Sequence, residues 1–282
     1  MTVLRIVTEK AIYIDSIIMK EKTKKRTRNV FLLLTAVFGA ALLLNRERLF
    51  SAGCIGEHHT ISVNGVTIYY EIAGEGNPVI LLHGNGGSHK DLHEEIRQLT
   101  EAGYRVYAPD SRGQGHSSSA EEYHYTDMAD DVFYLIQEWK LDKPALYGWS
   151  DGGIIGLLTE IRHPGTLGAL AVSGANVSPD GLEDSFLDPI RFLSPVAGSL
   201  TQMILNEPDI SEEELASIQI PVLVTAGSDD IIKREHTEMI ARSIPDAKLM
   251  ILEGESHGSY IAGSTKMGDL LLTFLKDKAA GE

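Results

Sequence analysis

The chain has 282 residues, of which 43% are hydrophobic and 23% charged, and its net charge is −15. This composition is typical of a folded globular protein; it excludes an intrinsically disordered chain and argues against nucleic acid as a partner. Cys54 is the only cysteine, so the sequence contains no disulfide framework and no thiolate metal cluster. We expect one domain with an N-terminal appendage, since a single core rarely serves more than about 250 residues.

The chain begins with a basic segment that leads into an apolar run. Residues 1–28 contain eight Lys and Arg against three Asp and Glu, and residues 30–44 contain no charged side chain. A helix of this run would extend about 22 Å, short of the hydrocarbon core of about 30 Å, and flanking arginines can reach the interface from both ends. We therefore predict a basic cytoplasmic segment over residues 1–28 and a membrane anchor (signal anchor) over residues 29–46.

The same segment has other interpretations. A cleaved signal peptide has an apolar region of similar length, in which case the protein would be secreted. A buried core helix is a third alternative, and Met19 is an alternative start that would leave a compact basic leader. For the anchor, the basic residues before the run predict a single-pass protein of the cell membrane with its main domain outside.

Further along, apolar runs alternate with segments of helical periodicity. Residues 59–74 alternate apolar and polar side chains around Asn64-Gly65, which predicts a β-hairpin. The apolar runs that follow are 78–82, 104–108, 145–147, 167–172, 221–225 and 248–252, and the helical segments are 89–102, 126–140, 153–162, 234–243 and 266–276. This alternation predicts an α/β fold with a mostly parallel, twisted sheet of about eight strands and helices on both faces. Residues 176–218 break the alternation, and we expect a short lid insertion there.

Polar residues follow several of the predicted strands, at the edge where open α/β sheets bind ligands. Ser150, then Asp229 and Asp230, then His257 each follow a different apolar run. A serine hydroxyl is a weak nucleophile that needs a base, an imidazole can take and return its proton near neutral pH, and a carboxylate can orient that imidazole. We therefore predict Ser150 as nucleophile and His257 as general base, with Asp229 and Asp230 as candidates for the carboxylate.

Three motifs resemble recurrent turns of the α/β-hydrolase family. GWSDG at 148–152 is similar to its G-x-S-x-G nucleophile elbow, DSRGQGHS at 110–117 to another of its turns, and HGNGGS at 83–88 to its oxyanion loop. The resemblance implies an α/β-hydrolase catalytic domain over residues 56–282. The family's spacing, counted from Gly227, favours Asp230 as the carboxylate.

The resemblance also implies further roles around Ser150. The backbone N–H groups of Asn85 and Asp151 would form the oxyanion hole. GWSDGG resembles the biphenyl-hydrolase-like group, to which valacyclovir-cleaving amino-acid ester hydrolases belong; there the matching aspartate receives the α-amino group of the substrate. Asp151 is thus a candidate substrate contact, with capping of a helix N-terminus as the alternative. Trp149 either lines the pocket, as a second substrate contact, or packs in the core.

Other polar residues near these strand ends are interpreted as structural. His83 would brace the oxyanion loop, and Asp110 and Arg112 would fix a turn by hydrogen bonds. No metal-ligand spacing joins His58 and His59 to other residues, so we expect neither a metal site nor a cofactor.

These residues predict a carboxylesterase-like serine hydrolase. It would cleave small carboxylic esters through an acyl-enzyme on Ser150, which water activated by His257 would release. An aminopeptidase, an amidase or a C–C bond hydrolase of the same fold is an alternative. A non-catalytic ligand-binding protein is an alternative of another class, as is an interaction protein that works through its acidic surface.

Overall fold

A computed structural model describes residues 55–194 and 198–281. The predicted basic segment 1–28 and the predicted anchor 29–46 lie outside these ranges. No helix within the two ranges has the length and apolar character needed to cross a membrane.

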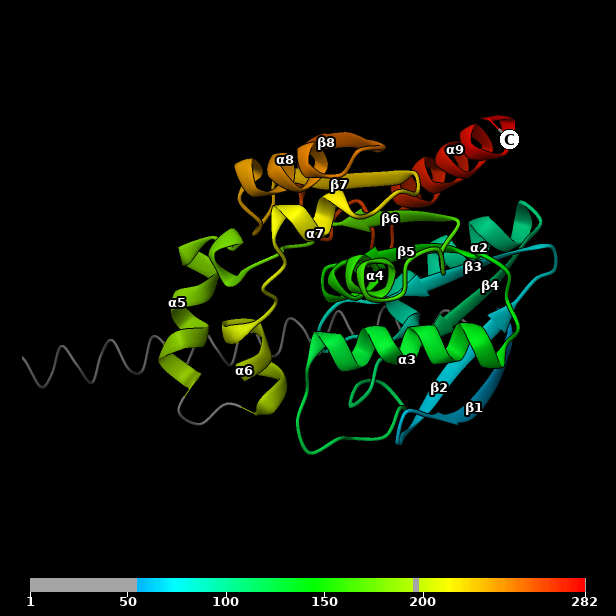
Figure 1. The fold of residues 1–282 in the computed structure, drawn as a ribbon, viewed down its shortest axis with the longest axis horizontal. Helices are drawn as coiled ribbons and strands as arrows, with labels where there is room; N and C mark the ends of the chain where they lie inside the picture. The colour runs from blue at the N-terminus through cyan, green and yellow to red at the C-terminus, as the bar shows by residue number, and fades with distance from the viewer. Residues whose placement is uncertain (1–54, 195–197, 282) are drawn as a thin grey trace, which may run out of the picture. The chain divides into compact units, whose positions relative to one another are not determined.

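Eight strands form one sheet in the order β1-β2-β4-β3-β5-β6-β7-β8 (Figure 1). The hairpin of β1 and β2 turns at Asn64 and Gly65, both with positive φ, and β2 also pairs antiparallel with β4. Every other neighbouring pair is parallel. The strands are β1 (Glu57–Val63), β2 (Val66–Ala73), β3 (Asn77–Leu82), β4 (Tyr104–Pro109), β5 (Ala145–Trp149), β6 (Ala169–Ser173), β7 (Val222–Asp229) and β8 (Ala247–Ser256). The mostly parallel sheet of about eight strands is therefore confirmed.

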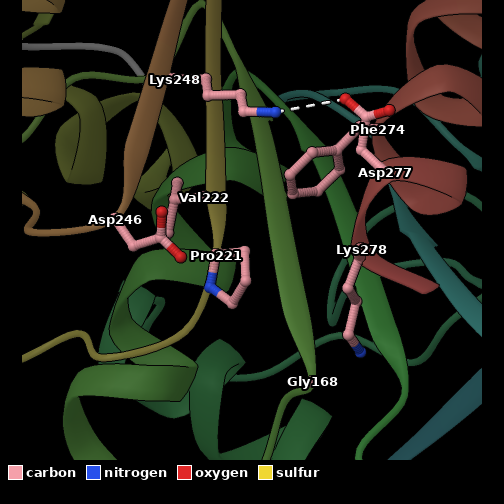
Figure 2. Close-up of a pocket in the computed structure, with 8 residues that line it drawn as sticks. All are labelled: Gly168, Pro221, Val222, Asp246, Lys248, Phe274, Asp277 and Lys278. Carbon is pink, nitrogen blue, oxygen red and sulfur yellow. Dashed lines mark hydrogen bonds and ion pairs between the residues drawn. The ribbon is translucent and has the colours of Figure 1, made fainter. Parts of the chain in front are cut away.

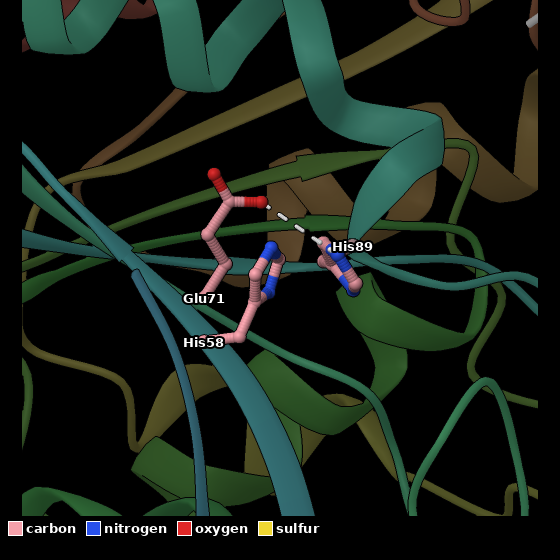
Figure 3. Close-up of side chains that lie close together, drawn as sticks. All are labelled: His58, Glu71 and His89. Atoms are coloured by element: carbon pink, nitrogen blue, oxygen red, sulfur yellow. Dashed lines mark ion pairs between the residues drawn. The ribbon is translucent and has the colours of Figure 1, made fainter. Parts of the chain in front are cut away.

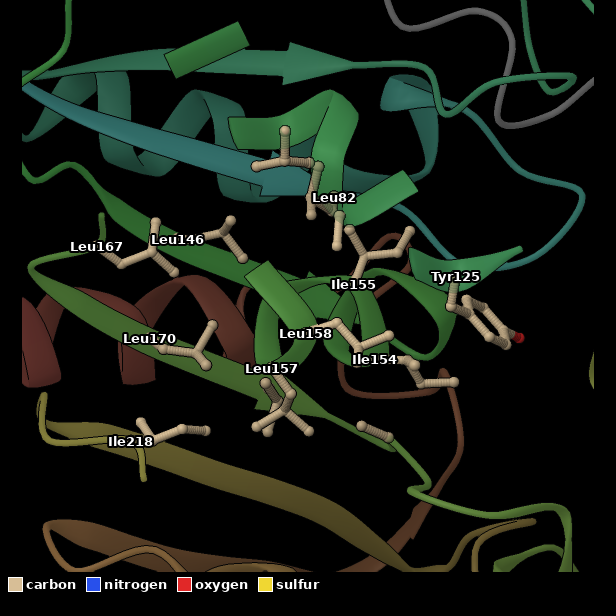
Figure 4. Packing of buried hydrophobic residues seen from close by; sticks show 14 of the residues in the cluster. Leu82, Tyr125, Leu146, Ile154, Ile155, Leu157, Leu158, Leu167, Leu170 and Ile218 are labelled. Carbon is tan, nitrogen blue, oxygen red and sulfur yellow. The ribbon is translucent and has the colours of Figure 1, made fainter. Parts of the chain in front are cut away.

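Helices cover both faces of the sheet, as the alternating pattern predicts. On one face α3 (Tyr125–Glu138), α4 (Asp151–Arg162) and α8 (Arg234–Ser243) enclose a core that includes Leu146 of β5 (Figure 4). On the other face α2 (His93–Glu101) and α9 (Lys266–Gly281) enclose a core that includes Tyr147, the next residue of β5. Successive side chains of a strand point to opposite faces, so each inner strand contributes to both cores.

The insertion between β6 and β7 consists of short helices. They are η2 (Pro179–Gly181), α5 (Asp184–Leu193), α6 (Ser199–Asn206) and α7 (Glu212–Ala216). Leu182 and Leu187 pack with Ile232 in a small cluster separate from the two main cores. Residues 176–218 thus form the predicted insertion, and the role of this insertion as a lid stays a prediction.

A cavity of about 340 Å³ lies at the amino ends of β6, β7 and β8, beside α9 (Figure 2). Lys248 of β8 and Asp277 of α9 form an ion pair across it at 3.2 Å. Ser150, in contrast, follows the carboxyl end of β5. The cavity is therefore at the edge of the sheet opposite to the predicted site.

Glu95 of α2 is a carboxyl group inside the protein. Its side chain is fully buried, and neither carboxylate oxygen has a hydrogen-bond partner among the residues described. Burial raises the pKa of Glu95 to about 8. Between about pH 4.5 and pH 8 this carboxyl is therefore protonated in the folded protein and ionised in the unfolded chain. The free energy of unfolding consequently falls as pH rises through this range.

Replacing Glu95 with glutamine should remove this pH dependence. At pH 8 we expect Glu95→Gln to raise Tm by several degrees, because the cost of ionising or protonating the buried carboxyl is on the order of 4 kcal/mol. At pH 5 the variant and the wild type should melt at similar temperatures. Calorimetry at both pH values measures this, with Glu101→Gln on the exposed side of α2 as control. A pH-independent difference between Glu95→Gln and wild type would contradict it.

Candidate active site

Ser150 joins β5 to α4 in a strained backbone conformation. Its φ is 54° and its ψ is −116°, values that few residues other than glycine adopt. A Cβ on Gly148 would lie 2.0 Å from the carbonyl oxygen of Gly152, and a Cβ on Gly152 would lie 2.3 Å from the carbonyl oxygen of Leu82. Glycine at both positions lets the turn close against β3, which presents the serine at the edge of the sheet.

His257, directly after β8, lies between the two predicted partners of its ring. Nε2 is 3.1 Å from Ser150 Oγ, and Nδ1 is 2.6 Å from Asp230 Oδ1. The Asp230 side chain is 1% exposed, and that of His257 is 19% exposed. The structure thus brings together three side chains that follow three different strands.

The two aspartates that the sequence left open differ in position. Asp230 also accepts hydrogen bonds from the backbone N–H groups of Gly227 at 3.3 Å and Ile232 at 3.1 Å. Asp229 is the last residue of β7 and is exposed. Only Asp230 of this pair contacts the imidazole of His257.

Two neighbours fix the position of His257. The indole N–H of Trp149 donates to the backbone carbonyl of His257 at 3.0 Å, and the two rings lie 5.9 Å apart. Gly174, after β6, has a positive φ, and a Cβ there would lie 2.8 Å from the imidazole. Trp149 packs partly against the core, and its indole also holds the backbone of His257; its contact with a substrate stays a prediction.

Asn85 and Asp151 are linked through their side chains. Asn85 Nδ2 donates to Asp151 Oδ2 at 2.8 Å, and the hydroxyl of Tyr125 donates to Asp151 Oδ1 at 2.9 Å. Burial raises the pKa of Asp151, although the bonds from Asn85 and Tyr125 act in the opposite direction. Tyr125 begins α3, and the sequence gives no sign of its contact with Asp151.

The backbone N–H groups of Asn85 and Asp151 have no acceptor within residues 55–194 and 198–281. For Asp151 this follows from its place as the first residue of α4, because the first N–H groups of a helix have no partner inside the helix. Two donors are therefore free at the loop and at the helix end next to Ser150.

The loop that carries Asn85 is braced to the turn after β4. His83 is buried, with Nδ1 2.7 Å from the Gly84 carbonyl and Nε2 accepting from the Ser111 N–H at 3.0 Å. The Gly86 N–H donates to Gln114. His83 therefore occupies the bracing position expected from the sequence.

Asp110 and Arg112 hold the turn itself. Asp110 accepts from the backbone N–H groups of His89 and His116, each at 2.8 Å. The Arg112 guanidinium pairs with Asp131 of α3 through two hydrogen bonds, one of them 2.6 Å long. Both residues thus have the structural contacts expected of them.

His58, Glu71 and His89 form a cluster that could hold a metal ion (Figure 3). The spacing of the histidines gave no sign of it, because the residues belong to β1, β2 and η1 (His89–Leu92). Two members of the cluster could have been found from the sequence. A two-residue turn at Asn64-Gly65 places His58 opposite Glu71, which is the observed register.

Comparison with known proteins supports the fold. Residues 77–197 match the family model described as alpha/beta hydrolase fold. The human serine hydrolase BPHL is 26% identical over 77% of this chain and 85% of its own length. The AB hydrolase superfamily protein YisY of Bacillus subtilis is 26% identical over 77% of this chain and 98% of its own length.

Solved structures agree as well. An esterase from Exiguobacterium antarcticum is 25% identical, with a TM-score of 0.67, over 78% of this chain and 99% of the esterase. The predicted fold and the resemblance to the biphenyl-hydrolase-like group are therefore confirmed. The chain is a hydrolase of the α/β-hydrolase fold and is similar in sequence to members of that family.

Proposed function

We propose that the protein is a serine hydrolase that cleaves small carboxylic esters through an acyl-enzyme on Ser150. The observation that carries the proposal is the continuous line of contacts from Asp230 through His257 to a serine on a strained turn. A base within hydrogen-bond distance of the nucleophile, itself oriented by a buried carboxylate, is what nucleophilic catalysis by serine requires.

In the first step His257 Nε2 takes the proton of Ser150 while Oγ attacks the ester carbonyl carbon. The imidazolium then gives this proton to the leaving alcohol as the C–O bond breaks, which leaves the acyl group on Oγ. In the second step His257 takes a proton from water, whose oxygen attacks the acyl carbon, and the proton returns to Oγ when the acid leaves. Asp230 holds the ring with Nδ1–H toward itself and stabilises its charged form.

The oxyanion that forms in each step needs hydrogen-bond donors that are already in place. The backbone N–H groups of Asn85 and Asp151 fit this role, since neither has an acceptor in the described part of the chain. Such donors are worth on the order of 3 kcal/mol each in the transition state. The side-chain bond between Asn85 and Asp151 links the loop and the helix end that carry the two donors.

The relatives support the substrate class. Their names include a serine hydrolase and an esterase, and these descriptions apply to those proteins. A panel of amides and of C–C bonded substrates next to the esters separates the alternatives within the same fold. The location at the cell membrane, and its secreted alternative, stay predictions, because residues 29–46 lie outside the described ranges.

Ser150→Ala should abolish ester hydrolysis. We expect turnover of p-nitrophenyl acetate by the full chain to fall by at least about 10³-fold, because alanine lacks the Oγ atom that would form the acyl-enzyme. A fluorophosphonate probe should label the wild type and not this variant. Ser217→Ala, an exposed serine after α7, is the matched control. Unchanged turnover or labelling in Ser150→Ala would contradict the assignment, and a folded but inactive and unlabelled wild type would favour a binding protein.

Asp230→Asn and Asp229→Asn form a matched pair of neighbouring substitutions. We expect Asp230→Asn to lower kcat by roughly 10³- to 10⁴-fold at pH 7, because an amide does not hold the ring in the required tautomer. Asp229→Asn should stay within about twofold of wild type, because this side chain is exposed and does not contact His257. Steady-state kinetics of the two variants decide between them; the reverse order would transfer the role to Asp229.

The second part of the proposal is that Asp151 binds the ammonium group of α-aminoacyl esters. In Asp151→Asn we expect kcat/KM for such esters to fall about tenfold or more relative to the same esters without the amino group, as one charged contact is lost. The measurement is the ratio of the two kcat/KM values in each protein. An equal loss for both substrates would show that Asp151 acts only through Asn85 and Tyr125.

A further inference from the structure

The cluster of His58, Glu71 and His89 lies apart from the line of contacts at Ser150. His58 and Glu71 face each other across the antiparallel pair β1 and β2, and His89 begins η1. Each residue offers one ligand atom, and all three atoms lie within 4.8 Å of one another. Figure 3 shows the three side chains converging.

The two histidines have buried nitrogen atoms with no hydrogen-bond partner in the described part of the chain. These atoms are both ring nitrogens of His58 and Nε2 of His89, and the His89 side chain is 1% exposed. Buried polar atoms are nearly always paired, because an unpaired one loses its hydration without compensation. A neutral imidazole has one N–H and one lone pair, so one lone pair of His58 and that of His89 Nε2 have neither a hydrogen-bond donor nor a metal ion to bind in the described part of the chain.

The contacts around the cluster direct its remaining lone pairs inward. His89 Nδ1 lies 2.7 Å from Asp110 Oδ1, so an N–H at this position donates to the carboxylate and Nε2 is left toward Glu71. Glu71 Oε1 accepts the backbone N–H groups of Ile55 at 3.0 Å and Gly56 at 2.7 Å, which leaves Oε2 at 3.6 Å from His89 Nε2. A carboxylate behind a histidine is the usual outer support of a metal ligand.

We propose that this cluster binds one Zn²⁺ ion through Nε2 of His89, a ring nitrogen of His58 and Oε2 of Glu71. Two imidazoles and one carboxylate suit zinc, whereas Mg²⁺ and Ca²⁺ prefer oxygen ligands throughout. Zinc bonds of about 2.0–2.1 Å place tetrahedral ligand atoms about 3.3 Å apart. His89 Nε2 and Glu71 Oε2 are 3.6 Å apart and all three ligand atoms lie within 4.8 Å of one another, so rotation of the partly buried His58 side chain would bring them to this spacing. Water takes the fourth position.

The ion has a structural role. It joins the β1–β2 hairpin at the edge of the sheet to His89, which directly follows the HGNGGS loop that carries Asn85. Asp110 supports the same site from the turn after β4. One ion therefore ties three separate chain segments together. This inference does not depend on the proposed ester hydrolysis.

Zinc titration of the metal-free full chain, with any purification tag removed, tests the proposal. We expect one equivalent of Zn²⁺ by calorimetry, and a visible spectrum typical of four-coordinate Co²⁺ when cobalt replaces it. His58→Ala should weaken zinc binding at least 100-fold. His59→Ala is the matched control and should bind like wild type, because its side chain is 40% exposed and lies near Glu57. Zinc at 100 times its Kd should raise Tm by roughly 5–10 °C in wild type and not in His58→Ala.

Two outcomes would overturn the proposal. In one, wild type with native circular dichroism binds no zinc at micromolar concentration, and His89 is then an ion-pair partner of Glu71 and Asp110. In the other, zinc binds equally well to wild type and to His58→Ala. Glu71→Gln provides a second variant of nearly the same shape, so that loss of binding in a folded protein can be separated from loss of the fold.

Discussion

The close approach of β5, α4 and β3 around Ser150 is the constraint on which the rest of the site depends. The serine backbone is held in a conformation that costs on the order of 1–3 kcal/mol. Burial of α4 offsets this cost: ten consecutive residues, from Asp151 to Glu160, are buried. A helix buried on all sides cannot rotate or slide without opening both the core and the turn. The position of the nucleophile is thus set by the packing of a whole helix, and a flexible loop could not fix it as well.

His257 and the loop of Asn85 are also positioned by packing against neighbouring segments, although they come from distant parts of the sequence. His257 is held by Trp149, which belongs to the strand that carries the serine, and by the close approach of Gly174 after the neighbouring strand. The loop of Asn85 is held by His83 and by the turn after β4. Parallel strands end at one edge of the sheet, so residues far apart in the chain meet there. Hydrogen bonds that involve the backbone, such as those of Trp149 to His257 and of Ser111 to His83, then limit the movement of these side chains and loops.

The sequence predicts those features that depend on short-range pattern. The alternation of apolar runs gives the sheet, and G-x-S-x-G gives the turn, because both follow from backbone geometry within a few residues. Features that depend on packing between distant segments are not predictable in this way. Tyr125 reaches Asp151 only because α3 packs beside α4, and Glu95 looks like a surface residue of a polar helix although it is fully buried. The cluster of His58, Glu71 and His89 is intermediate, since the hairpin register places His58 opposite Glu71 but gives no sign that His89 lies beside them.

Asp151 combines structural contacts with a proposed role in substrate binding; it is the first residue of α4, and its carboxylate accepts from Asn85 and Tyr125 and does not cap the helix. Its two oxygens accept one bond each, from Asn85 and from Tyr125, whereas a carboxylate has about four acceptor positions. The carboxylate therefore keeps acceptor positions for the ammonium group of the proposed substrates. Because burial raises the pKa of Asp151, a cation at this carboxylate would also favour its charged form. The same carboxylate holds Asn85, whose backbone N–H faces the oxyanion in the proposed mechanism, so recognition of the substrate cation and stabilisation of the transition state share one hydrogen-bonded unit.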